Sequence, residues 1–238
     1  LTSSTAGYNV AVGFNAGVSV TTGVQNTIIG GLASDALTTG ERNVVIGHGA
    51  MGSANGSESR NIAIGWSALS QMDSDTNNYN VAVGYNAGAV VTTGIENVLI
   101  GALAGDAITT GSYNVALGHN SLTAEDTGSR SIAIGYFALS TQNYNGDAYN
   151  VAIGHAAGQL ITTSIQNTLI GALAGDALTT GGGNVAVGYQ ALSSEDENGT
   201  NVAVGFQSLA TQNAGTNAYN IAVGYLAGSA ITTGIVNT

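Results

Sequence analysis

The side chains that could bind or react recur at regular intervals along this chain. It has three histidines, His48, His119 and His155, and His48 and His119 are 71 residues apart, too far along a stacked repeat to share a metal within one chain. The absence of cysteine excludes thiol catalysis and cysteine-based metal sites. The carboxylates fall into repeating columns, and no unique pair suggests cleavage of a polysaccharide. We therefore expect no enzyme, no catalytic residue and no cofactor.

One column of aspartates, Asp35, Asp106 and Asp176, is a weak candidate for holding a metal ion. Oxygen-rich turns can bind calcium, but neither an EF-hand loop nor a nine-residue calcium-binding repeat is present. Two alternatives therefore stay open for these residues. They lie in solvated turns, or they hold an ion between chains, and we predict no established metal site.

A column of aromatic residues is the best candidate for contact with a partner. Aromatic rings stack on sugars, so a periodic row of them could bind a glycan on a host surface. Alternatively, the same rings pack between chains. The three histidines occupy the same column. Its aromatic members are Phe14, Trp66, Tyr85, Tyr136, Tyr189, Phe206 and Tyr225.

These residues are spaced by a pentad, Asn-aliphatic-x-aliphatic-Gly, that recurs along the whole chain. Its first residue is numbered 0 here, so the aromatic column is position +5. Successive pentads follow in steps of 17, 18 or 19 positions, and a near-constant period of this size is typical of a stacked repeat protein. Ser131 takes position 0 once. The asparagines are Asn9, Asn26, Asn43, Asn61, Asn80, Asn97, Asn114, Asn150, Asn167, Asn184, Asn201, Asn220 and Asn237.

The pentad predicts a short strand in each repeat. The β-branched residues at +1 and +3 share one face, which we assign to the core, while position +2, usually alanine, points away. Glycine at +4 ends the strand, and a second strand follows it. Position +7 is always Ala or Ser, which implies close packing across a thin coil or against another chain. The asparagines form a ladder along the stack or hold turns locally.

The repeats group in fours. Asn9 and Asn80 are 71 residues apart, and the next two steps, to Asn150 and to Asn220, are 70 residues each. Blocks run over about 9–79, 80–149 and 150–219, with partial blocks at both ends. We predict an all-β parallel β-solenoid of 17–19-residue coils, with residues 1–238 forming a single segment of a longer fibre. Duplication of whole blocks is typical of a protein that provides length.

Composition excludes several classes of partner. The net charge is −11, and only three residues are basic, so a nucleic-acid groove and binding to an anionic membrane are both disfavoured. No segment approaches the roughly 20 apolar residues of a membrane span. Ice binding would need an uninterrupted threonine array, but Thr-Thr-Gly is confined to the first and second coils of a block.

The pentads resemble those of a known class of proteins. Ser131-Ile-Ala-Ile-Gly135 and Asn61-Ile-Ala-Ile-Gly65 are similar to head repeats of YadA-type trimeric autotransporter adhesins. The longer phrase from Asn80 to Gly88, with Thr92-Thr-Gly94, resembles repeats of bacteriophage tail-fibre proteins. The resemblance implies a left-handed β-roll, a homotrimer and a role in reaching and attaching to surfaces. The period of the pentads in this chain is longer than the period typical of such adhesin heads.

On these grounds we expect a structural fibre shaft, most simply a viral tail fibre that supports attachment to a host surface. The expected partners are further copies of the chain and a glycan or protein of the host surface, without membrane insertion. The expected location is a virion tail fibre or an extracellular surface. Two alternatives stay open: a bacterial surface adhesin head and a self-assembling extracellular filament.

Overall fold

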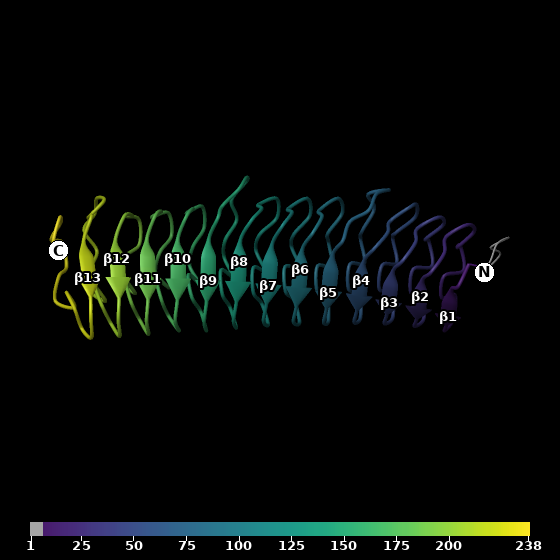
Figure 1. Cartoon of the computed structure of the whole chain (residues 1–238), viewed down its shortest axis with the longest axis horizontal. Coiled ribbons are helices and arrows are strands. Elements are labelled where there is room, and N and C mark those ends of the chain that lie inside the picture. Colours follow the sequence, from purple (N-terminus) through teal and green to yellow (C-terminus); the bar gives the residue numbers. More distant parts are fainter. Residues whose placement is uncertain (1–6) are drawn as a thin grey trace. The chain divides into compact units, whose positions relative to one another are not determined.

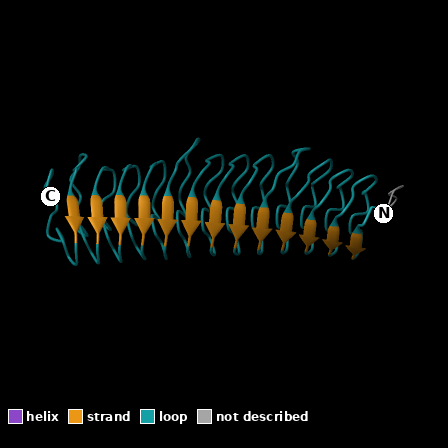
Figure 2. Ribbon diagram, viewed as in Figure 1, coloured by secondary structure: helices purple, strands orange, loops and turns teal. Residues whose placement is uncertain are grey.

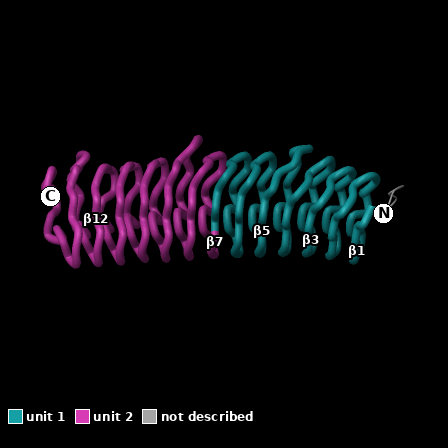
Figure 3. Tube along the Cα trace, in the orientation of Figure 1, with its two compact units in different colours: residues 1–116 teal, residues 117–238 magenta. Residues whose placement is uncertain are grey.

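The structure, a computed structural model, describes residues 7–238 and divides the chain into two compact units, Leu1–Ala116 and Leu117–Thr238 (Figure 3). In both units three-residue strands alternate with turns, and the described part of the chain contains no helix (Figure 2). Residues 7–238 therefore include no helix that is long and apolar enough to cross a membrane. The predicted all-β parallel β-solenoid is therefore confirmed.

The strands occupy positions +1 to +3 of each pentad (Figure 1). In the first unit they are β1 (Val10–Val12), β2 (Thr27–Ile29), β3 (Val44–Ile46), β4 (Ile62–Ile64), β5 (Val81–Val83) and β6 (Val98–Ile100). Strand β7 (Val115–Leu117) spans the boundary. The second unit holds β8 (Ile132–Ile134), β9 (Val151–Ile153), β10 (Thr168–Ile170), β11 (Val185–Val187), β12 (Val202–Val204) and β13 (Ile221–Val223).

Within each unit, consecutive strands pair in parallel and in register. Val10 lies opposite Thr27 in β1 and β2, and Ile132 lies opposite Val151 in β8 and β9. In both pairs the partners are one pentad repeat apart in the sequence, so one solenoid coil corresponds to one sequence repeat. The predicted coil length is confirmed, because every pentad contributes its strand at the same place in the stack.

The predicted orientation of the strands is wrong. Position +2 points into the coil, and Ile28, Val45 and Leu99 there are fully buried. Positions +1 and +3 point outward instead, and from β2 to β13 each strand has a buried central residue between two more exposed ones, as in β5 and β11. The interior of the coil is too narrow for two β-branched columns, so alanine is the usual residue at +2.

The small residues at position +7 lie inside the coil, which decides between the two predicted environments. Ala50, Ala87 and Ala174 are fully buried within their own unit. Where one inner position of a coil holds a large side chain, another inner position holds a small residue. A Cβ atom on Gly105 would lie 2.7 Å from Leu99 Cδ2, so the leucine at +2 occupies the volume that a side chain at +8 would need. Close packing of this kind resists even small changes of volume.

The predicted second strand is absent from the described coils, each of which contains a single three-residue strand. After the glycine at +4 the chain turns, and residues at +6 and +8 adopt left-handed backbone angles. Leu32 has φ of 56° and Leu69 has φ of 49°. An extended strand cannot contain such residues, which explains why the β-structure stops after three residues.

Candidate functional site

The asparagines at position 0 form a buried ladder in each unit. The Oδ1 atom of one asparagine accepts the backbone N–H of the next, at 2.8–3.1 Å from Asn9 to Asn114. In the second unit the corresponding distances are 2.8–3.2 Å from Asn150 to Asn237. Asn97 also donates through Nδ2 to the Gly111 carbonyl across the coil, at 2.9 Å. The column is thus a structural device without access to a ligand, since every member from Asn26 to Asn220 is fully buried.

At Ser131, the one serine in this column, the side-chain amide of a nearby glutamine replaces the missing asparagine amide. Gln142 donates through Nε2 to Ser131 Oγ at 2.8 Å, and its Oε1 accepts from Asn150 Nδ2 at 2.8 Å. All three residues are fully buried. Gln142 therefore supplies the amide group that Ser131 lacks, and the polar column of the second unit remains hydrogen-bonded.

The outer face of the strands is apolar. Positions +1 and +3 carry β-branched or leucine side chains in every described coil, and threonine takes +1 in β2 and β10. The members that are more than a third exposed are Val10, Val12, Ile29, Ile62, Leu117, Ile170, Ile221 and Val223. This outer face, positions +1 and +3, is a continuous apolar strip within each unit, because in-register strands stack their side chains in columns.

The aromatic residues at +5 stack along this strip in groups of three. Trp66 lies between His48 and Tyr85, with ring centroids 6.5 Å and 5.2 Å away. In the second unit Tyr136 lies between His119 and His155, at 5.5 Å from each. A third group, Tyr189, Phe206 and Tyr225, is spaced by 5.4 Å. Each group ends where the second coil of a block carries Gly31, Ala102 or Ala172 instead of a ring.

All seven aromatic residues predicted as contact residues are exposed in the chain. Phe14 is the one member outside the three stacks, and the next residue in its column is Gly31. The histidines lie within the stacks and are separated by aromatic rings, as His119 and His155 are by Tyr136. The column is therefore exposed and its imidazoles are not grouped within the described chain, while its role in contact with a partner stays a prediction.

The three aspartates proposed as weak metal candidates lie in separate coils, one in each block, and each is partly exposed. No group of three or more His, Asp or Glu side chains suited to a metal ion occurs within residues 7–238. Asp176 differs in having a buried Oδ1 atom without a hydrogen-bond partner, and burial raises the pKa of its carboxyl. One unpaired oxygen is insufficient to define a cation site.

The first unit contains a polar pocket that the sequence did not suggest. It has a volume of about 310 Å³ and lies between the turns that precede β3, β4 and β5. Two carboxylates face it from opposite turns, those of Glu41 and Asp75. Its full lining is Thr39, Glu41, Ser57, Ser59, Asp75, Thr76 and Asn77.

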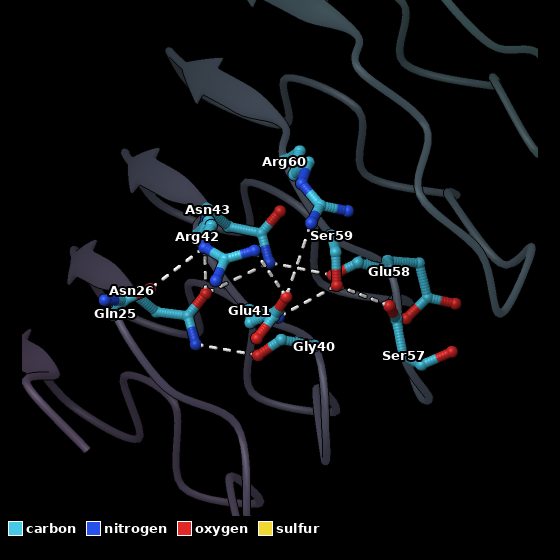
Figure 4. Close-up of polar contacts among 10 residues, drawn as sticks. All are labelled: Gln25, Asn26, Gly40, Glu41, Arg42, Asn43, Ser57, Glu58, Ser59 and Arg60. Atoms are coloured by element: carbon cyan, nitrogen blue, oxygen red, sulfur yellow. Dashed lines mark hydrogen bonds and ion pairs between the residues drawn. The ribbon is translucent and has the colours of Figure 1, made fainter. Parts of the chain in front are cut away.

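Hydrogen bonds and ion pairs hold one wall of this pocket in place (Figure 4). Glu41 Oε1 lies 2.8 Å from Arg42 Nη1 and 3.6 Å from Arg60 Nη2. The Ser59 hydroxyl accepts the backbone N–H of Glu41 at 2.9 Å and donates to the Ser57 carbonyl at 2.7 Å. The opposite wall is joined to this one by the Ser57 hydroxyl, which donates to the Asp75 carbonyl at 2.7 Å.

The expectation that all carboxylates recur in columns is wrong at this pocket. The position of Glu41 is taken by Ser112 and Gly182 in the other blocks, and that of Asp75 by Asn145 and Gly215. An alignment of the blocks against one another would have exposed this departure. The sequence alone still could not place these two carboxylates in one pocket, because their proximity depends on the stacking of three coils.

Two buried glutamates lie in the turns of the second unit, Glu125 and Glu195, both fully buried. The Glu125 carboxylate accepts the Gly128 N–H and the Gln142 amide, each at 2.8 Å, yet burial raises its pKa. Burial also raises the pKa of Glu195 above its usual value of 4.5, and the charge of Asp196 adds to this. The Oε2 atom of Glu195 has no hydrogen-bond partner.

These raised pKa values predict a stability that falls with increasing pH. In the folded chain Glu195 keeps its proton to higher pH than in the unfolded chain, where the pKa is near 4.5. Between the unfolded and folded pKa values the native state therefore binds more protons, and the free energy of unfolding decreases as pH rises. We expect Glu195→Gln to raise the melting temperature at pH 7 and to flatten its pH dependence, as measured by circular dichroism.

The matched control is Glu197→Gln, which removes the same charge from another position in the same turn. It should leave the pH dependence of the melting temperature as in the unmodified chain. Equal flattening by both substitutions would show that overall charge, rather than the buried carboxyl, governs this dependence.

Comparison of the chain with models of protein families, with curated proteins and with solved structures finds no match.

Proposed function

We propose that this chain is part of the shaft of an extracellular fibre, in which identical chains associate through the outer face of their strands. The observation that carries the proposal is the apolar strip at +1 and +3, present on every described coil. Apolar patches larger than a few hundred Å² are rare on monomeric soluble proteins and mark interaction surfaces. The same surface on each chain suits self-association.

The strip and the aromatic column together approach the size of a stable interface. With strands about 4.8 Å apart and about 3.3 Å per residue, the six three-residue strands of one unit present roughly 300 Å². One partner in a stable complex usually contributes about 800 Å², so the strips of both units and the rings at +5 are all needed. The aromatic stacks at +5 extend the strip with rings, a residue class enriched in interfaces.

A trimer is the assembly we favour, because the pentads resemble repeats of trimeric fibres and adhesins. The buried amide ladders support a mechanical role. Each asparagine joins its coil to the neighbouring ones through hydrogen bonds that water cannot reach. Continuous ladders of this kind resist local opening, and a shaft that holds a binding tip away from a viral surface requires such resistance. A bacterial adhesin head and an extracellular filament are the alternatives.

The outer face can be tested by introducing charge. Ile62 and Ile170 are 37% and 38% exposed and lie on β4 and β10, one in each unit. We expect the unmodified chain to sediment as a trimer, three times 23.5 kDa. The double variant Ile62→Glu, Ile170→Glu should sediment as a monomer that keeps its β-sheet circular dichroism, because a buried unpaired carboxylate is costly.

The control places the same two charges outside the strands, by Gln71→Glu and Thr163→Glu at exposed turn positions. This variant should remain trimeric. A monomeric unmodified chain would contradict the proposed assembly. Trimers that survive charge on the outer face would show that the chains associate through another surface.

A further inference from the structure

We propose that the polar pocket between the turns preceding β3, β4 and β5 binds a neutral saccharide. This inference is independent of the shaft function, since it concerns one side of the first unit and needs no second chain. The pocket volume of about 310 Å³ lies at the lower end of the range of about 300–1,000 Å³ for small-molecule sites. Its polar lining is unlike the mostly apolar walls of such sites, and this points to a ligand covered with hydroxyl groups.

The unused hydrogen-bonding groups of the pocket match a polyol. Glu41 directs one carboxylate oxygen to the two arginines, and its Oε2 atom has no partner in the structure. Asp75 uses Oδ1 to accept the Ser57 N–H at 3.3 Å, which leaves Oδ2 as an acceptor. The Asn77 side chain, which makes no hydrogen bond, offers both a donor and an acceptor. Neighbouring sugar hydroxyls can donate to the carboxylates and accept from the amide.

The charge distribution favours a neutral ligand over a cation. Arg42 and Arg60 both contact Glu41 and offset its charge. The buried Glu58 carboxylate is turned to the chain itself, where it accepts the backbone N–H groups of Gly56, Ser74 and Asp75 at 3.0–3.1 Å. Asp75 is then the one carboxylate of the pocket without a facing cation. A calcium ion usually takes six to eight oxygen ligands, and an anionic sugar would be repelled by the uncompensated carboxylate of Asp75.

The arrangement is not required by the repeat. Glu41 and Asp75 have no acidic counterparts in the other blocks, although those blocks form the same coils. Glu41 also makes its ion pairs at the surface, where such pairs contribute little to stability. The pocket is therefore a local feature added to a structural scaffold, as a binding site would be.

The test uses the full chain and four neutral probes: the methyl α-glycosides of glucose, galactose and mannose, and N-acetylglucosamine. Binding is followed by saturation-transfer NMR titration. The pocket variant is Glu41→Ser, Asp75→Asn, in which each new residue copies the next block, so the fold is expected to tolerate it. The control, Asp73→Asn, Glu96→Gln, loses the same charge from the same part of the chain and copies Asn143 and Gln166.

We expect saturable binding of at least one probe, weakened at least about tenfold in the pocket variant and unchanged in the control; tenfold corresponds to about 1.4 kcal/mol. A parallel titration with calcium chloride tests the competing ligand. The proposal is overturned if no probe binds saturably, if both variants bind equally well, or if calcium alone binds at the pocket. None of these results bears on the trimer, which sedimentation tests separately.

Discussion

Gly30→Ala should destabilise the first unit severely. Gly30 follows β2 at position +4 with φ of 138°, and a Cβ atom there would lie 2.4 Å from the Gly47 carbonyl oxygen and 2.6 Å from its carbon. Both atoms belong to the backbone of the next coil, so no side chain can move aside. A non-glycine residue in a sparsely populated backbone region costs about 1–3 kcal/mol, and overpacking costs about 1–3 kcal/mol more.

The expected total is about 2–6 kcal/mol, which at about 2–4 °C per kcal/mol corresponds to a fall in melting temperature of roughly 4–24 °C for a chain of this size. Thermal unfolding followed by circular dichroism measures it. The control is Gly31→Ala, one residue further on. There the nearest atom to a Cβ is His48 Cδ2 at 3.4 Å, and alanine already stands at the equivalent Ala102 and Ala172. Equal melting temperatures for the two variants would contradict the close approach of the coils.

Asn97→Ala should have the second large effect, because it interrupts the buried ladder. Asn97 Oδ1 accepts the Asn114 N–H at 3.0 Å, and its Nδ2 donates to the Gly111 carbonyl at 2.9 Å. Alanine would leave both backbone groups buried and without these partners, and each such group costs about 1–3 kcal/mol. We expect a loss of about 2–6 kcal/mol in the free energy of unfolding measured with urea.

The part of the chain that Asn97→Ala destabilises can be measured as well. Amide hydrogen exchange should accelerate most at Asn114, whose N–H loses its acceptor, because repeat proteins open locally between neighbouring coils. Asn55→Ala, at an exposed asparagine in a turn of the same unit, is the control and should change neither quantity. Unchanged exchange at Asn114 in the Asn97 variant would show that the ladder contributes little.

The repeat made the positions of the strands predictable, since a pattern seen thirteen times outweighs the weak preference of any one segment. The orientation of the strands was predicted wrongly. Alternation along a strand shows that its two faces differ, but it does not say which face is inside. Side-chain size favours the larger residues at +1 and +3 for the core. In the folded coil Ala82 at +2 is fully buried, and Leu69 and Leu99 of the neighbouring coils fill the space at Gly88.

For the candidate surfaces, too, the sequence indicated one part and the tertiary structure decided the other. The aromatic column was found from its spacing, because residues one period apart are neighbours in any stacked solenoid. That its rings are exposed depended on the direction in which the turn after Gly65 or Gly135 carries Trp66 or Tyr136. The pocket of Glu41 and Asp75 includes the one 18-residue step of the repeat, from Asn43 to Asn61, and its two carboxylates do not recur in the other blocks.

The sequence by itself determined the coil length, the place of each strand, the asparagine column and the scarcity of basic residues. These depend on local spacing and composition, which are the same in the unfolded chain. The tertiary structure decided which strand face is enclosed, and that Glu41, Ser59 and Asp75 meet across three coils. When a coil closes, only side chains small enough for its interior can face inward. Stacking of the coils then brings together residues that are distant in the chain.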